Sequence, residues 1–224
     1  SNERKKFGVV AVASGDGLKE MFTSLGADAI VDGQQTMNPS SEDFIKAFDA
    51  VNADTIIVLP NNSNILLAAK QAGELYKDSD IRVVESTTIA EGYAALTMLD
   101  LTSEDIDVII DDLKMAIGGV TTGLVTYAVR DTSQDGFEIK KDDWLGFSKK
   151  TILSVEKDKV SAATALLDSI DKTGKEVIIA IAGKDATAEE LSAVHEYASK
   201  NFPLVEFYEV DGGQDIYSFI FAVE

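Results

Sequence analysis

Cysteine is absent from this chain of 224 residues, and histidine occurs once. A chain without cysteine forms no disulfides, no thiol nucleophile and no zinc site built on thiolates. His195 has no second histidine or cysteine to join it in a metal site, so we expect a partly packed or surface side chain. Chains without cysteine suit the cytoplasm, which we take as the expected location.

Basic residues are scarce as well. Lysine and arginine number 20 against 39 aspartates and glutamates, which gives a net charge of −19. The resulting negative field repels nucleic-acid phosphates and anionic lipid surfaces, so we expect no nucleic-acid partner. The opening SNERKKFGVV is typical of neither a signal peptide nor a membrane span, so no membrane insertion is expected. Because the first strand begins within a few residues, we expect a piece of a longer polypeptide.

Catalytic motifs with a known mechanism are missing from the sequence. There is no G-x-x-x-x-G-K-[ST], no G-x-S-x-G and no H-E-x-x-H. GDGLKE matches only half of G-x-G-x-x-G, because Glu20 stands where the third glycine belongs. No nucleophile, base and orienting group come together, so the sequence indicates a binding module and predicts no catalytic residue.

The first half alternates apolar, strand-like runs with helical segments. FGVVAVAS, ADAIVDG, DTIIVLP and IRVVES are the expected strands. Continuous apolar strands alternating with helices predict an α/β fold with a parallel sheet covered on both faces. We expect Gly26 to close the first helix, Ser40 and Asp43 to form a capping box, and Asn64 to cap the helix ILLAAKQAGELY.

The second half shows a different pattern. A helix is expected at 103–117, and Gly118-Gly119 after it is the natural division of the chain. TTGLVTYAVRDTS then alternates with period two, Asp135-Gly136 predicts a hairpin turn, and strands and helices follow. We therefore predict a parallel, Rossmann-like lobe with polar ligand-facing loops at 1–119, and a mixed, largely antiparallel α/β lobe at 120–224.

Four strand-to-helix loops of the first half are unusually polar. They are SGDG (14–17), DGQQTMNPSS (32–41), PNNSN (60–64) and STT (86–88). Because such loops emerge at the carboxyl edge of a parallel sheet, we expect them to line one cleft. Their amides, hydroxyls and helix-start N–H groups suit carbonyl, carboxylate or phosphate oxygens.

Each candidate residue in these loops also has a structural explanation, because Asn, Ser, Thr and Gly are ordinary turn and cap residues. Capping alone accounts for Ser40, a tight turn accounts for Asp16, and an ion pair with Asp131 is expected for Arg130 rather than anion recognition. No metal-binding residue is predicted. The predicted ligand-binding residues are Asp16, Gln35, Thr36, Asn38, Ser40, Asn61, Asn62, Thr87 and Arg130.

Three blocks carry a resemblance to a known family: GQQTMNPSSED (33–43), VLPNNSN (58–64) and TTGLVTYAVRDTSQDGFEIKKDDWLGF (121–147). They resemble the C-terminal region of the fatty acid kinase A-subunit family, whose members are also catalogued as dihydroxyacetone-kinase-like. The likeness runs over essentially the whole chain. The family usually reads Gly-Gly-Gln-Thr-Met-Asn-Pro-Ser, whereas Gln34 replaces the second glycine here, so a loop that needs positive φ there would differ.

The resemblance implies a DegV-related α/β module within a larger kinase. Such kinases transfer the γ-phosphate of ATP to a fatty acid carboxylate, and the acyl phosphate feeds phospholipid synthesis. ATP and magnesium belong to a helical kinase domain that this chain lacks, so no cofactor is expected in the fragment itself. The implied partners are a fatty-acid-binding protein of the DegV type and the kinase domain of the same polypeptide, and the resemblance allows a homodimer of the parent.

Three functions stay open at this point. The first is a non-catalytic C-terminal module of a bacterial fatty acid kinase that recruits the fatty-acid-binding partner. The second is a stand-alone small-ligand or lipid-binding DegV-like protein, which a large apolar tunnel would favour. The third is an autonomous dihydroxyacetone-kinase-like phosphotransferase or phosphatase, which turnover of ATP or acyl phosphate by the chain itself would favour.

Overall fold

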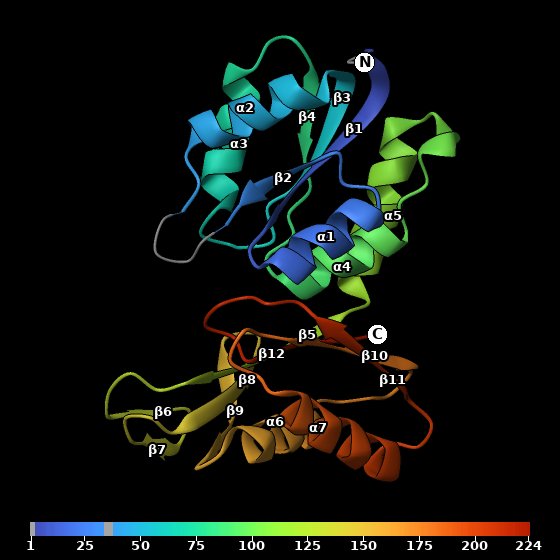
Figure 1. The fold of residues 1–224 in the computed structure, drawn as a ribbon. Coiled ribbons are helices and arrows are strands. Elements are labelled where there is room, and N and C mark those ends of the chain that lie inside the picture. Colours follow the sequence, from blue (N-terminus) through green and yellow to red (C-terminus); the bar gives the residue numbers. More distant parts are fainter. Residues whose placement is uncertain (1–2, 34–37) are drawn as a thin grey trace. The chain divides into compact units, whose positions relative to one another are not determined.

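The computed structural model describes residues 3–33 and 38–224 and divides into two compact units (Figure 1). Unit 1 runs from Ser1 to Val120 and unit 2 from Thr121 to Glu224. The predicted division at Gly118-Gly119 falls on the last residue of helix α5 (Ile106–Gly118) and its C-cap. Among the residues described, no helix has the length and apolar character needed to cross a membrane.

Unit 1 contains a four-stranded parallel sheet with the order β2-β1-β3-β4. Its strands are β1 (Lys5–Ala13), β2 (Ala29–Asp32), β3 (Ala53–Leu59) and β4 (Asp80–Val83). All three neighbouring pairs are parallel, and Val10 of β1 stands between Ala29 and Val58. The predicted parallel sheet is therefore confirmed, and every strand of it ends at the same edge.

Helices cover both faces of this sheet. They are α1 (Asp16–Ser24), α2 (Ser41–Val51), α3 (Leu66–Leu75), α4 (Ile89–Thr97) and α5, with a short 3-10 helix η1 (Leu101–Ser103) before α5. Figure 1 shows α2 and α3 on one face and α1, α4 and α5 on the other. Phe44 and Phe48 of α2 pack with Val10 and Val58 of the sheet, which is the helical spacing that the sequence predicts.

Two of the predicted caps are confirmed. The Ser40 hydroxyl accepts from the Asp43 amide at 3.4 Å, and the Asp43 carboxylate accepts from the Ser40 amide at 2.9 Å. Gly26 has φ of +122° and donates its amide to the Thr23 carbonyl, so it closes α1. Both caps are local interactions, which is why short sequence patterns predict them.

Two predicted helix starts are wrong. Asn64 does not cap α3, because the N-cap is Ile65 and the Asn64 amide donates to the side-chain oxygen of Asn62 at 2.8 Å. The helix expected from residue 103 begins at Ile106. Asp105 caps it by accepting from the Asp107 amide, and the residues before it form η1.

Unit 2 is built on a six-stranded sheet with the order β11-β10-β12-β5-β8-β9. Its strands are β5 (Thr121–Tyr127), β8 (Trp144–Ser148), β9 (Thr151–Glu156), β10 (Val177–Ala182), β11 (Glu206–Asp211) and β12 (Phe219–Val223). Only β10 and β11 pair in parallel within this sheet, so the predicted mixed, largely antiparallel second half is confirmed. Helices α6 (Lys159–Ser169) and α7 (Ala188–Asn201) pack on Phe219, Phe221 and Val223.

A small hairpin projects from this sheet. It consists of β6 (Thr132–Gln134) and β7 (Phe137–Ile139), and the predicted turn Asp135-Gly136 joins them with φ of 51° and 83°. Such positive φ angles are those of a type I′ turn, in which Asp-Gly is favoured. The alternation expected through Arg130 is wrong beyond Tyr127, because the Ala128 amide and carbonyl turn away to Asp143 and Asp142.

The second two-residue turn, between β8 and β9, lacks a favoured residue. Lys149 and Lys150 have φ of 50° and 66°, which side chains with a Cβ adopt at a cost. We expect the double substitution Lys149→Asn with Lys150→Gly to raise the free energy of unfolding by about 1 kcal/mol in urea denaturation.

The matched control removes the same charges at Lys140 and Lys141, which do not have positive φ. Lys140→Asn with Lys141→Gly should bring no gain. An equal gain at both sites would assign the effect to charge and contradict the backbone explanation.

Tyr76 predicts a pH effect in unit 1. Its hydroxyl donates to Asp49 at 2.7 Å and its ring meets Phe48 edge-on at 5.3 Å. Burial, and then the bond to Asp49, raises the pKa of Tyr76 to about 12. Since this exceeds the unfolded value of about 10, the stabilisation is complete below about pH 10 and is lost as the pH rises through 12.

The measurement is the ultraviolet titration of the chain minus that of Tyr76→Phe. The difference should titrate near pH 12, and Asp49→Asn should move it downward. A difference that titrates at the ordinary tyrosine value would contradict the burial of this phenol.

Candidate site at the carboxyl edge of the parallel sheet

The carboxyl ends of β1 to β4 bring several predicted site residues to one edge of unit 1. Because the strands are parallel, the loops after Ala13, Asp32, Leu59 and Val83 all leave from that edge. Gln35 and Thr36 lie outside the described residues, and Arg130 belongs to unit 2. The candidates that follow these strand ends are Asp16, Asn38, Ser40, Asn61, Asn62 and Thr87.

Asn61 is the buried centre of this edge, with 4% of its surface exposed. Its side-chain nitrogen donates to the Val12 carbonyl at 2.9 Å, and its side-chain oxygen accepts from the Ser86 hydroxyl at 2.8 Å. The Asn61 amide also donates to Ser86, at 3.0 Å. The side chain therefore joins the loop after β3 to the end of β1 and to the loop after β4, and its polar atoms are occupied by protein partners.

Helix α4 approaches this centre through a glycine. A Cβ on Gly92 would lie 2.1 Å from the side-chain oxygen of Asn61, so only glycine fits at this position. Sequence reasoning named Thr87 and missed Ser86 and Gly92. The available signals were the STT segment itself and an isolated glycine within a helical pattern.

Three other candidates serve local structure in the hydrogen bonds that they make. Asn62 accepts from the Asn64 amide at 2.8 Å, and Ser40 caps α2. The Thr87 amide and hydroxyl donate to the Glu91 carboxylate at 2.7 and 3.0 Å. These bonds are the turn and cap interactions that competed with ligand binding as explanations of the sequence.

Asp16 is exposed and is the first residue of α1. Gly15 precedes it with φ of +88°, and this N-cap has no side chain to accept from the first amides of the helix. The Asp16 carboxylate itself lies in the first turn, where negative charge is favourable. It therefore supplies the anion that this helix start attracts.

Asn38 lines an open groove of about 550 Å³ along the outer edge of β2. β2 is an edge strand of the sheet, and α2 forms the other wall. Asp32 at one rim pairs with Lys19 at 2.8 Å, and Lys46 at the other rim lies 4.0 Å from Glu42. The groove combines an apolar floor with polar rims. Its lining residues are Ala29, Ile30, Val31, Asp32, Asn38, Pro39, Asp43, Lys46, Ala47 and Ala50.

Arg130 is exposed and lies beyond the end of β5. The expected ion pair with Asp131 is wrong for the part of the chain that the structure describes. The Asp131 carboxylate instead accepts from the backbone amide of Lys141 at 2.8 Å, because the chain turns into the hairpin at this point.

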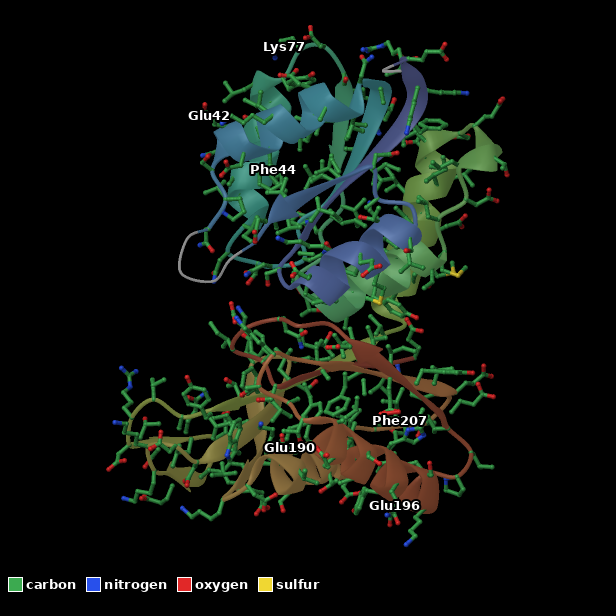
Figure 2. The ribbon with its side chains drawn as sticks, in the orientation of Figure 1. Glu42, Phe44, Lys77, Glu190, Glu196 and Phe207 are labelled. Atoms are coloured by element: carbon green, nitrogen blue, oxygen red, sulfur yellow. The ribbon has the colours of Figure 1, made fainter. Side chains whose placement is uncertain are left out.

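A second polar cluster, which sequence reasoning missed, surrounds Lys159 in unit 2. Lys159 is 8% exposed and lies 4.9 Å from the centre of the Trp144 ring. Its ammonium donates to the Glu190 carboxylate at 3.1 Å and to the Asp185 carbonyl at 2.7 Å. Ser218 donates to the Asp185 carboxylate at 3.0 Å. Glu190 lies at the start of α7 (Figure 2), so the cluster ties α6 to α7.

The charges in this cluster compensate each other. Burial raises the pKa of Glu190, but the Thr187 amide and the Lys159 ammonium outweigh it, so the pKa lies below its usual value. A buried charge needs such a partner, which is why Lys159 is retained inside unit 2. Its members are far apart in the chain, so no local pattern predicts it.

His195 matches its expected environment. Its ring packs 4.7 Å from the ring of Phe207, and its Nδ1 atom lies 3.2 Å from the Glu209 carboxylate. Within residues 3–33 and 38–224, no three histidine, aspartate or glutamate side chains gather as ligands for a metal ion.

Comparisons with known proteins agree with this architecture. Two solved structures share the fold over nearly the whole chain. DegV, a fatty acid binding protein from Bacillus subtilis, has a TM-score of 0.65 at 16% identity and covers 98% of this chain and 100% of its own. The dihydroxyacetone kinase from C. freundii, in complex with AMP-PNP and Mg²⁺, has a TM-score of 0.62 at 13% identity and covers 97% of this chain and 48% of its own. At these identities the likeness shows the fold alone, and the predicted DegV-like fold is confirmed.

Curated sequences give closer matches. Protein YloV of Bacillus subtilis is 36% identical over 221 residues, which are 99% of this chain and 40% of that protein. Protein SH1689 of Staphylococcus haemolyticus is 39% identical over 216 residues, which are 96% of this chain and 39% of that protein. The chain thus spans about two fifths of the relatives that it matches. The family of C-terminal regions like that of the fatty acid kinase A-subunit matches residues 8–224, and this chain belongs to that family.

Proposed function

We propose that this chain is the C-terminal, non-catalytic module of a bacterial fatty acid kinase and that it recruits a fatty-acid-binding partner of the DegV type. The family match over residues 8–224 carries the proposal. The kinase domain, with ATP and magnesium, belongs to another part of the same polypeptide, consistent with relatives of which this chain covers 40% or less. The parent makes acyl phosphate for phospholipid synthesis in the cytoplasm and forms a homodimer.

The chemistry of the candidate edge supports a non-catalytic role. Phosphoryl transfer depends on cations that neutralise the charge developing on the phosphoryl oxygens. None of the six described candidates at the carboxyl edge is cationic, and Asn61 is occupied by Val12 and Ser86. Recruitment needs none of these groups to react.

The test of recruitment is calorimetric titration of this chain with the fatty-acid-binding protein of its own organism. We expect saturable binding without ATP, because docking precedes chemistry on another domain. The matched control is the same titration with thermally unfolded chain. A correctly folded chain that does not bind would contradict the recruiting role.

Turnover by the parent protein gives a second readout. The parent without residues 1–224 should still bind ATP but should lose about 100-fold or more of its activity on presented fatty acid, because proximity of the substrate is lost. Undiminished turnover would contradict the proposal.

A second candidate function is lipid binding by the chain itself. The observation that favours it is a fold shared with a DegV family protein from Eubacterium eligens loaded with heptadecanoic acid, with a TM-score of 0.58 over 97% of this chain. Native mass spectrometry of the chain with heptadecanoic acid distinguishes the two functions. One retained fatty acid per chain would support lipid binding, and none at saturating concentration would contradict it.

A further inference from the structure

One face of α5 combines exposed apolar side chains with carboxylates. We call it the acidic–apolar face and define it by Val108, Asp111, Asp112 and Met115. Val108 is 45% exposed and Met115 is 78% exposed. They lie about two helical turns apart and therefore on one stripe, with the two aspartates between them. The opposite side of α5 packs into unit 1.

The carboxylates of this face are not neutralised within the protein. In the described part of the chain, Asp111 and Asp112 form no ion pair, and Lys114, the one basic residue of α5, pairs with neither. Arg82 reaches only Asp107, at 3.5 Å. The face therefore offers negative charge around an apolar centre.

A solvated helix face is the simplest alternative in a chain with a net charge of −19. Helix α7 shows what such a face is like. Its exposed acids include Glu189 and Glu196, the latter on the outer side of the helix (Figure 2) and 3.7 Å from Lys200. Among the described residues, α7 has no large apolar side chain as exposed as Val108 or Met115. The acidic–apolar face differs from it by these two side chains.

We propose that the acidic–apolar face docks the fatty-acid-binding partner, through a partner surface on which lysine or arginine side chains surround an apolar hollow. This inference rests on the proposed recruiting function. The aspartates pair with the partner's cations, and the net negative field of the chain steers such a surface toward it. Met115 and Val108 fill the hollow, and a methionine side chain adapts readily to the shape that it meets.

The test compares three variants in the titration with the fatty-acid-binding protein. Asp111→Lys with Asp112→Lys should weaken binding by about 100-fold, because attraction becomes repulsion. Val108→Ser with Met115→Ser should weaken it by about 10-fold or more through lost apolar contact. Glu189→Lys with Glu196→Lys, which changes the net charge by the same amount, should stay within about 3-fold of the original chain, because its carboxylates lie outside the docking face.

The outcomes separate this inference from the proposed function. If the original chain binds and the α5 variants bind equally well, the docking face is wrong while recruitment stands. If the α5 and α7 charge variants weaken binding alike, long-range charge explains the effect and the face is wrong. If the original chain does not bind at all, recruitment fails and the inference fails with it. Circular dichroism checks that each variant is folded, and the serine variant, which adds no charge, decides if the lysine variant unfolds.

Discussion

Alanine at position 183 is expected to lower the free energy of unfolding of unit 2 by about 3 kcal/mol. A Cβ on Gly183 would lie 2.2 Å from the Tyr217 carbonyl oxygen and 3.0 Å from that of Gln214. Both atoms are backbone, and the Gly183 amide donates to the Ser218 carbonyl at 2.7 Å, so the loop after β11 cannot withdraw without losing hydrogen bonds. Urea denaturation followed by fluorescence of Trp144, the only tryptophan, reports on this unit.

The control for this substitution is Gly174→Ala. Gly174 has φ of +73° but nothing within 4 Å of an added Cβ, so alanine there should cost only the conformational strain of about 1 kcal/mol. If Gly183→Ala costs no more than Gly174→Ala, the close approach of the loop to Gly183 is contradicted.

The same loop contains Gln214, which is 2% exposed. Its side-chain nitrogen donates to the carbonyls of Ile181 and Tyr217 at 3.0 and 3.1 Å. Gly183 and Gln214 thus hold one loop against the end of β10 from two sides. We expect substitutions at these two positions to be non-additive, since they share the same contacts.

Asn61→Ala is expected to lower the free energy of unfolding of unit 1 by about 3 kcal/mol, because it leaves the Val12 carbonyl and the Ser86 hydroxyl buried without their partner. Alanine also tolerates the φ of 58° at this position less well than asparagine does. Scanning calorimetry gives the total change, and hydrogen exchange of peptides from β1 and β3 assigns it to unit 1.

Two controls separate the parts of this effect. Asn61→Gly removes the side chain but accepts the positive φ, so it should recover about 1 kcal/mol relative to alanine. Asn62→Ala, in the same loop, removes only an exposed turn bond and should cost about 1 kcal/mol or less. Equal losses at Asn61 and Asn62 would contradict the central role of Asn61.

The helices and strands were largely predictable, because their signals are local or periodic. The apolar runs of β1 and β3 indicate strands buried on both faces, and the stripe of Phe44 and Phe48 indicates the buried side of α2. Ser40 with Asp43 and Asp135-Gly136 are short motifs whose partners lie within a few residues. The parallel order of four strands follows from their alternation with helices.

The roles of single polar residues were less predictable. Asn61 and Asn62 are neighbours of the same type, yet one is buried among three elements and the other closes a turn. Arg130 and Asp131 are adjacent and still do not pair in the described structure, because Asp131 accepts from Lys141. Adjacency in the chain says little about which hydrogen bond a polar side chain makes once distant backbone groups compete for it.

The sequence by itself determined the two-part α/β architecture, the edge at which the polar loops gather and the family, because periodicity, turn motifs and long residue blocks are properties of the chain alone. Only the tertiary structure decided that Asn61 serves the fold, that Gly92 and Gly183 admit a neighbouring atom, and that Lys159 is neutralised inside unit 2. The reason is physical. Burial and close approach arise when segments distant in the chain pack together, and no local pattern records which atoms will then meet.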